Sequence, residues 1–216
     1  MARRSAGLFV TLEGGEGAGK STQTTLLAER LAGLGVSVLT TREPGGTDTA
    51  ERLRTILLDP DVKLDAMEQV LLFYAARHNH VERVIRPALS EGKVVICDRF
   101  SDSTVAYQGA AGGVAAEAVQ QIDHTVLGGF GPDLTLLLDL PVENGTQRIV
   151  SRGEETDRFE QASVSFHQRL RDAFLEIAQR EPERVKVIDA LQPVETIAGQ
   201  IHEAVLTRLP ALTAPQ

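Results

Sequence analysis

A glycine-rich octapeptide between a predicted strand and a predicted helix constrains the fold more than any other feature. Residues 14–21 read GGEGAGKS, which matches the pattern GxxxxGK[ST]. The glycines let the backbone curl with its N–H groups pointing inward, and the next helix offers its positive end to an anion. The segment therefore predicts a phosphate-binding loop, in which Lys20 reaches the β- and γ-phosphates and Ser21 ligates Mg²⁺. The predicted ATP-binding residues are Gly14, Gly15, Glu16, Gly17, Ala18, Gly19, Lys20, Ser21 and Thr22.

Short apolar segments alternate with helical patterns along the whole chain. The predicted strands are 8–12, 36–41, 93–97, 134–138 and 185–188, and the predicted helices are 20–34, 47–58, 65–91 with a bend at Pro87, 114–127, 142–150, 163–180 and 194–206. Such alternation predicts an α/β fold, a five-stranded parallel sheet with helices on both faces. No linker or repeat interrupts the pattern, so we expect residues 1–216 to form a single domain.

The composition excludes several classes of protein. Apolar residues make up 42% and charged residues 24% of the 216 residues, which is typical of a soluble globular protein. A net charge of −8 and only 4% aromatic residues argue against nucleic acid as a partner. We read no signal peptide and no apolar stretch long enough for a membrane span, and one cysteine cannot form an internal disulfide. The sequence therefore predicts a cytoplasmic protein.

Charged residues follow the second and third predicted strands, where the ligands of a parallel sheet collect. Asp98-Arg99-Phe100 closes the third strand. An aspartate there can hold a metal-bound water or orient a phosphate acceptor, and the adjacent arginine can clamp an anion. The same residues, taken alone, also fit a salt bridge at a strand end. The segment 42–47, REPGGT, follows the second strand in the same way, and Arg54 lies on the next helix.

Two further polar segments carry different interpretations. The stretch from Arg148 to Glu160 has a glycine, acidic residues and spaced arginines between two helices, which predicts a mobile lid at about residues 148–160. Its closure would bring arginine to the transferring phosphoryl group and exclude water; taken alone, the stretch also fits a solvated loop. The triplet 78–80, HNH, is interpreted as a solvated helix face and not as a metal pair.

The phosphate loop alone does not choose between a kinase, a GTPase switch and an ATPase regulator. A guanine-specific switch would carry an NKxD segment, but the two asparagines, Asn79 and Asn144, are followed by histidine and glycine. A kinase for a small anionic acceptor remains favoured. Its rivals are a kinase for another nucleotide or a nucleoside, and an ATP-binding regulatory module that has no small acceptor.

Three segments resemble the thymidylate kinase family: 73–77, FYAAR; 42–47, REPGGT; and 98–109, DRFxxSTxAYQG. The resemblance runs from about Phe9 to Leu191 and is closest to the bacterial type, with an acidic residue in the phosphate loop and an arginine in the lid. Phe100 departs from it, because many relatives have tyrosine or histidine there, and the lid is one residue longer. The resemblance implies a P-loop nucleoside monophosphate kinase fold that transfers the γ-phosphate of ATP to dTMP with Mg²⁺, in dTTP synthesis.

The resemblance also implies how the acceptor is bound. Phe73 would stack on the thymine ring and Arg77 would hydrogen-bond its carbonyl, with Thr104 and Gln108 at the base edge. Tyr107 would lie under the deoxyribose and disfavour a 2′-hydroxyl group. Without the resemblance, Phe73 is typical of a core residue, because it lies in the apolar run 70–76. The family forms homodimers through such helices, so a homodimer is expected.

The charged roles come from the resemblance as well. Arg54 and Arg99 would hold the dTMP phosphate, and Asp98 and Glu16 would organise the acceptor phosphate, the metal and the sugar hydroxyl. Arg152 would neutralise the phosphates on lid closure, with Arg158 as a second candidate. The predicted catalytic residues are Lys20, Asp98, Arg99 and Arg152, and the predicted metal ligands are Ser21 and Asp98.

Overall fold

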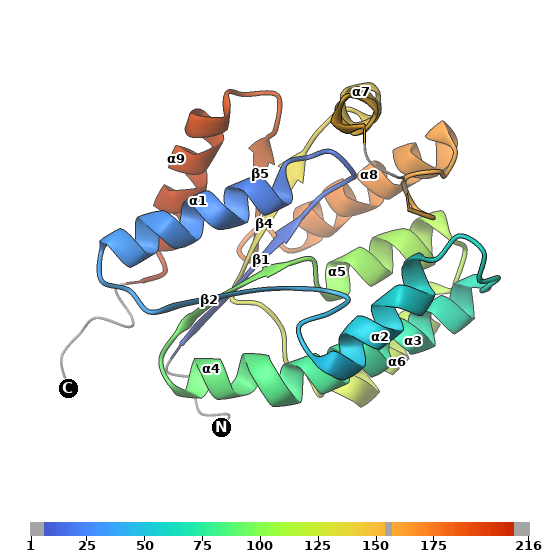
Figure 1. Ribbon diagram of the computed structural model, residues 1–216, viewed down its shortest axis with the longest axis horizontal. Coiled ribbons are helices and arrows are strands. Elements are labelled where there is room, and N and C mark those ends of the chain that lie inside the picture. The colour runs from blue at the N-terminus through green and yellow to red at the C-terminus, as the bar shows by residue number, and fades with distance from the viewer. Residues whose placement is uncertain (1–6, 154–156, 210–216) are drawn as a thin grey trace.

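The computed structural model describes residues 7–153 and 157–209, and a five-stranded parallel sheet lies at its centre (Figure 1). The strands are β1 (Leu8–Glu13), β2 (Val38–Arg42), β3 (Val94–Asp98), β4 (Leu134–Asp139) and β5 (Val185–Asp189). Their order across the sheet is β2-β3-β1-β4-β5, and each neighbouring pair is parallel. The predicted fold class is confirmed.

Helices cover both faces of this sheet. They are α1 (Lys20–Gly33), α2 (Asp48–Leu58), α3 (Ala66–His80), α4 (Arg86–Ser90), α5 (Ser101–Thr104), α6 (Ala116–Leu127), α7 (Val142–Arg152), α8 (Val164–Arg180) and α9 (Val194–Leu206), with the π-helical segments η1 (Val81–Ile85) and η2 (Val105–Ala111). In Figure 1, α1 and α9 lie on one side of the sheet, and α2, α3, α4 and α6 lie on the other. Within the described residues, no helix is long and apolar enough to cross a bilayer.

The central strand β1 separates two cores because its side chains alternate between the two faces. Leu8, Val10 and Leu12 pack in the cluster that contains apolar residues of α1 and α9. Phe9 points the other way, into the cluster built by α3 and α6. All six residues of β1 are buried, which explains why the strand reads as a continuous apolar run ending at a charged residue.

The strand registers bring three chain segments to one edge of the sheet. Leu12 of β1 pairs with Asp98 of β3, and Asp98 also pairs with Arg42 of β2. The phosphate loop begins directly after β1, the 43–47 turn follows β2, and Arg99 follows β3. The predicted site segments therefore meet at the carboxyl edge, as expected for parallel strands.

The long helix predicted over residues 65–91 is present, but one segment of it is not α-helical. The chain is helical from Ala66 to Ser90, but the segment before Pro87 is π-helical, η1. The Arg86 N–H donates to the Val81 carbonyl, five residues earlier. Proline has no N–H and crowds the preceding turn, so the wider register before it accommodates the ring without ending the helix.

Two helical segments near the site differ from those expected. Residues 101–111, which we did not assign to an element, form α5 and η2. Helix α7 continues to Arg152, two residues beyond its expected end, so residues 148–152 of the predicted lid are helical. The left-handed Gly153, φ 69°, caps that helix. Residues 1–6 and 210–216 lie outside the described residues.

Candidate active site

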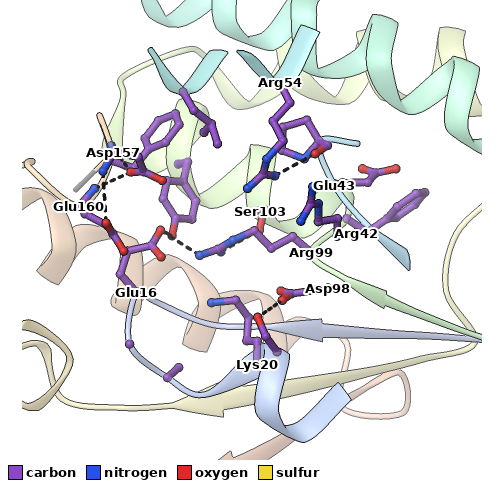
Figure 2. A pocket seen from close by; sticks show the side chains of 18 of the residues that line it. Glu16, Lys20, Arg42, Glu43, Arg54, Asp98, Arg99, Ser103, Asp157 and Glu160 are labelled. Carbon is purple, nitrogen blue, oxygen red and sulfur yellow. Dashed lines mark hydrogen bonds and ion pairs between the residues drawn. The ribbon is translucent and has the colours of Figure 1, made fainter. Parts of the chain in front are cut away.

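A cavity of about 710 Å³ opens at the carboxyl edge of the sheet. Its volume is in the range of small-molecule sites. It joins the phosphate loop to the 42–44 segment, α2, α3 and η2 (Figure 2). The predicted site residues that line it are Glu16, Gly17, Ala18, Gly19, Lys20, Ser21, Thr22, Arg54, Phe73, Arg77, Asp98, Arg99, Thr104, Tyr107 and Gln108. Gly14 and Gly15 line a smaller pocket behind the loop.

The phosphate loop has the curled backbone that its glycines predict. Gly14 and Gly17 have φ values of 136° and 72°, a region that side chains rarely allow. A Cβ atom at Gly14 would lie 2.5 Å from the Leu138 carbonyl oxygen, and one at Gly17 would lie 2.6 Å from the Gly145 carbonyl oxygen. Only glycine fits there. The loop leads into the N-terminus of α1, an arrangement that binds anions.

Lys20 and Ser21 begin α1 beneath the cavity. The Lys20 ammonium donates to the Gly14 and Gly15 carbonyl oxygens at 3.1 and 2.9 Å. Burial lowers the pKa of Lys20, and the nearby Arg99 lowers it further. Among the described residues, the hydrogen-bond partners of this buried ammonium are neutral carbonyl oxygens, so its charge can bind a polyanion.

Ser21 and Asp98 offer a pair of hard oxygen ligands. The Ser21 hydroxyl donates to the Asp98 carboxylate at 2.9 Å. Among the described residues, no group of three histidine, cysteine or acidic side chains could hold a metal. Mg²⁺ commonly binds through one or two protein oxygens together with phosphates and waters, so this pair fits Mg²⁺ bound with a nucleotide.

Arg99 is held in a strained backbone conformation at the end of β3. Its φ of 68° is left-handed, which costs a non-glycine residue on the order of 1–3 kcal/mol. The Arg99 guanidinium donates to Glu16 at 2.9 Å and to the Gly14 carbonyl at 3.0 Å. It also lies over the Tyr107 ring, with its central carbon 4.9 Å from the ring centre. The strain thus directs a guanidinium across the cavity toward the phosphate loop.

The buried carboxylate of Glu13 supports this turn, and sequence reasoning missed it. Glu13 accepts from the Phe100 N–H at 2.7 Å and from the Ser103 hydroxyl at 2.6 Å. Burial, followed by the charge of Asp102, raises the pKa of Glu13 to about 7. Glu13 therefore holds the backbone of Phe100, the residue after Arg99, in place.

Glu16 joins the two sides of the cavity. Its carboxylate accepts from Arg99 and from the Tyr107 hydroxyl, the latter at 2.6 Å. Burial alone would raise the pKa of Glu16, but the charges of Arg99 and Lys20 outweigh it and lower the pKa to about 2. Glu16 is therefore an anion at neutral pH, and Tyr107 is fixed beside it.

Arg54 enters the cavity from α2 (Figure 2). Its guanidinium donates to the Pro44 carbonyl at 2.9 Å. Burial lowers the pKa of Arg54, and the charges of Arg42 and Arg99 lower it further. Guanidinium groups close enough to repel one another would be stabilised by an anion between them.

Aromatic and amide groups line the other end of the cavity. Phe73 is partly buried, with its ring centre 6.3 Å from that of Phe159. The Gln108 amide donates to Gln69 at 3.1 Å. Arg77 donates to Thr104 at 3.0 Å, and its Nη1 is buried without a hydrogen-bond partner among the described residues. This end combines an apolar ring with an unused donor.

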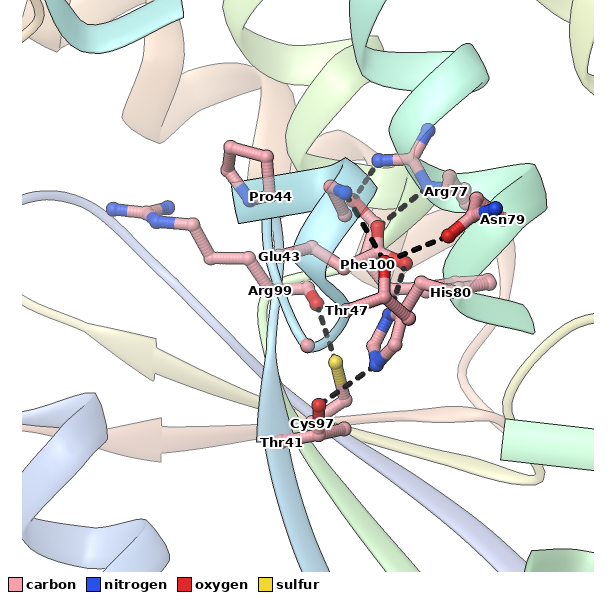
Figure 3. A network of polar contacts seen from close by, with 12 residues as sticks. Thr41, Glu43, Pro44, Thr47, Arg77, Asn79, His80, Cys97, Arg99 and Phe100 are labelled. Carbon is pink, nitrogen blue, oxygen red and sulfur yellow. Dashed lines mark hydrogen bonds and ion pairs between the residues drawn. The ribbon is translucent and has the colours of Figure 1, made fainter. Parts of the chain in front are cut away.

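The interpretation of residues 78–80 as a solvated face holds for His78, which is exposed, but was wrong for His80. His80 is fully buried (0% exposed), and its ring contacts Thr41 and Glu43 (Figure 3). Asn79 accepts from the Thr47 hydroxyl at 2.7 Å. These partners lie at the end of β2 and in the turn that follows it, which the helix sequence alone cannot place beside α3.

The structure describes only some of the residues of the predicted lid. Arg152 ends α7, but its side chain lies outside the described part, as do residues 154–156. Arg158 donates to the Asp59 and Val62 carbonyls and does not line the cavity. Arg148 does line it, and donates to the Gly17 carbonyl at 3.2 Å and the Ala190 carbonyl at 2.9 Å. Among the described arginines of this stretch, Arg148 is the one that touches the phosphate loop.

A sequence model of a family described as thymidylate kinase matches residues 12–201. The chain belongs to the thymidylate kinase family. It is 51% identical over 211 residues to a thymidylate kinase of Afipia carboxidovorans, covering 96% of this chain and 92% of the relative. Its identity to a Caulobacter vibrioides thymidylate kinase is 50% over 204 residues, covering 94% and 98%. The family resemblance predicted from the sequence is confirmed.

A solved structure supports the same membership. The thymidylate kinase of Ehrlichia chaffeensis superimposes with a TM-score of 0.75 at 35% identity, over 93% of this chain and 98% of that one. The chain is thus an enzyme, a kinase of this family, with the nucleotide-binding fold that the phosphate loop indicated.

Proposed function

We propose that the chain transfers the γ-phosphoryl group of ATP, with Mg²⁺, to dTMP and so forms dTDP for dTTP synthesis. The observation that best supports this proposal is that a single cavity is lined by Lys20 and Ser21 at one end and by Phe73 and Arg77 at the other. Arg99 lies between the two ends and donates to the phosphate loop. A donor triphosphate and an acceptor monophosphate would therefore meet at Arg99.

The proposed mechanism depends on positioning and charge. The acceptor phosphate is already anionic at neutral pH, so no general base is required. Lys20 and Arg99 would stabilise the charge on the transferring group, and Arg54 would hold the acceptor phosphate. Mg²⁺, held by Ser21 and Asp98 with the nucleotide, would neutralise the phosphate oxygens. Arg152 would add its charge when the lid closes.

The base end of the cavity supports a thymine ring as its occupant. Phe73 offers a stacking face, and base–aromatic stacking is worth roughly 1–3 kcal/mol. The Nη1 of Arg77, which no described residue contacts through a hydrogen bond, is a donor only and so fits a carbonyl oxygen of the base. Thr104 and Gln108 belong to the same wall, and Tyr107 with Glu16 would border the sugar.

One assay tests the proposal directly. ATP consumption is measured with dTMP, thymidine, UMP or no acceptor under the same conditions. The proposal expects dTMP to be preferred, because the guanidinium groups require an acceptor phosphate. Preference for thymidine or UMP would replace it with another nucleoside or nucleotide kinase. Consumption that no acceptor increases would favour a regulatory ATP-binding module.

The proposal also covers the domain organisation, the cellular location and the oligomeric state of the chain. Residues 1–216 would act as a single kinase domain with a mobile lid, in the cytoplasm, without nucleic acid or membrane. A homodimer is supported by the exposed apolar side chains of Met67 and Leu71, one turn apart on α3. Sedimentation of the wild type and of Leu71→Arg tests this: the proposal expects a dimer that the substitution dissociates, and a wild-type monomer would refute it.

A further inference from the structure

A buried chain of hydrogen bonds runs behind the base end of the cavity and ends at Arg77 (Figure 3). The Thr41 hydroxyl contacts His80 Nε2 at 2.7 Å, and His80 Nδ1 contacts Glu43 Oε1 at 3.0 Å. Arg77 Nε donates to Glu43 Oε2 at 2.7 Å. Glu43, Arg77 and His80 are all buried. One almost fully buried carboxylate is therefore shared between a histidine and an arginine.

This arrangement determines the direction of the unused donor of Arg77. A guanidinium is planar and rigid, so fixing two of its nitrogens fixes the third. Glu43 fixes Nε, while the Phe100 carbonyl and the Thr104 hydroxyl fix Nη2 at 3.1 and 3.0 Å. The remaining nitrogen, Nη1, is the one without a partner among the described residues. Because Glu43 supplies the only negative charge in this set, it contributes most to the orientation.

The turn that carries Glu43 is packed tightly against the end of α3. Thr47 donates to Asn79, and a Cβ atom at Gly46 would lie 2.5 Å from the His80 ring. The carbonyl of Pro44, the residue after Glu43, accepts from Arg54 at 2.9 Å. A displacement of Glu43 would therefore affect Arg77, at the proposed base site, and Arg54, at the proposed phosphate site of the acceptor.

We propose that Glu43 is the residue that positions Arg77 toward the base of the acceptor, and that His80 holds Glu43 in this orientation. The inference rests on the proposed function, since it concerns the same acceptor. Glu43 borders the same cavity, but its two carboxylate oxygens are engaged by Arg77 and His80, so it acts through Arg77. Its loss weakens acceptor binding and leaves the donor end of the cavity, at Lys20, as it was.

The test compares a disruptive and a conservative substitution at Glu43. In Glu43→Gln the amide oxygen still accepts from Arg77 Nε, and the amide N–H can donate to the other tautomer of His80. In Glu43→Leu both contacts are lost. For Glu43→Leu we expect the KM for dTMP to rise about tenfold or more, the KM for ATP to stay within about twofold, and kcat to fall less than KM rises. Glu43→Gln should restore most of the KM for dTMP.

A second pair of variants keeps the test decisive if Glu43→Leu fails to fold. Asparagine at position 80 places an amide nitrogen near the position of His80 Nδ1, whereas leucine places none. His80→Leu should raise the KM for dTMP, and His80→Asn should restore it. Equal dTMP constants in His80→Asn and His80→Leu, with both proteins folded, would overturn the proposal.

Tyr74→Phe is the matched control on the same helix. It removes a 2.7 Å hydrogen bond to Asp123 but keeps the ring that lies 4.6 Å from the Arg77 guanidinium carbon. Its stability should fall while the KM for dTMP stays unchanged. If Glu43→Leu folds and its KM values for dTMP and ATP change by the same factor, Glu43 forms only a structural ion pair and the proposal is wrong. A wild-type enzyme that does not phosphorylate dTMP would overturn the proposed function and this inference with it.

Discussion

At the scale of a single residue, the raised pKa of Glu13 predicts a pH dependence of the stability. Raising its carboxyl pKa from 4.5 to about 7 means that the folded state binds a proton between these pH values that the unfolded chain has released. The contribution of Glu13 to stability therefore falls as pH rises from about 4.5 to 7, by on the order of 3 kcal/mol, and does not change further above 7. Glutamine at position 13 does not titrate and mimics the protonated acid.

Denaturant unfolding of the wild type and of Glu13→Gln between pH 4.5 and 8 measures this effect. The stability of Glu13→Gln relative to the wild type should increase up to about pH 7 and then level off. Glu195→Gln, at an exposed ion pair, should run parallel to the wild type. Parallel curves for Glu13→Gln would show that the carboxyl is ionised across the whole range.

The residues that could be predicted from the sequence are those whose environment is local. Lys20 and Ser21 are determined by the loop directly before them, so a pattern of eight residues was sufficient. Glu13 and Glu43 could not be found this way, because their partners Phe100 and Arg77 lie 87 and 34 positions away in the sequence. Their signal, an acidic residue at the end of an apolar strand, becomes specific only when the strands are placed side by side.

At the scale of elements, the contact between α7 and the phosphate loop predicts the effect of Gly145→Ala. Alanine favours a helix interior by about 1 kcal/mol over glycine. Here its Cβ would lie 2.6 Å from the Glu16 carbonyl oxygen, so α7 or the loop must move. We expect kcat/KM for ATP to fall about tenfold, because small misplacements of phosphate ligands are costly.

Steady-state kinetics with varied ATP, together with thermal unfolding, measure this prediction. Gly199→Ala is the control, since Gly199 lies inside α9 with no atom within 4 Å of its added Cβ. It should raise stability by roughly 0.5–1 kcal/mol and leave the kinetics unchanged. If Gly145→Ala behaves like Gly199→Ala, α7 does not constrain the phosphate loop.

The proposed lid leads to different expectations for two arginines. Arg152→Ala should lower kcat on the order of a hundredfold and nucleotide affinity much less, because a lid arginine would act in the transition state. Arg158→Ala should lose the contacts to the Asp59 and Val62 carbonyls and leave kcat nearly unchanged. Turnover rates and binding calorimetry with ATP separate the two quantities. Loss of affinity without loss of kcat in Arg152→Ala would remove the lid from the chemistry.

Among the elements, the strands and the amphipathic helices were predictable because each has its own apolar pattern. The helix over residues 101–111 was not, since the sequence SDSTVAYQGAA has no clear apolar period. Its helical form depends on burial of Tyr107 and its neighbours against α8. The π-helical segment before Pro87 follows from proline chemistry, although the exact turn that widens depends on the surrounding packing.

At the scale of the whole molecule, the strand order brings the two nucleotide sites of the proposed function into one cavity. With β1 between β3 and β4, the phosphate loop lies beside the segment that begins with Arg99. The acceptor side then comes from β2, α2 and α3, on the far side of β3. The sequence predicted a parallel sheet but not this order, because apolar strands carry little information about their neighbours.

Calorimetric binding of a bisubstrate analogue, in which adenosine and thymidine are joined through their 5′ positions by a polyphosphate chain, tests this central claim most directly. We expect one analogue per chain, bound with Mg²⁺ more tightly than ATP or dTMP alone and displaced by either nucleotide. Lys20→Ala should remain folded and lose most of this affinity. If the analogue is displaced by only one of the two nucleotides, or binds Lys20→Ala as tightly as the wild type, the donor and the acceptor do not share the cavity.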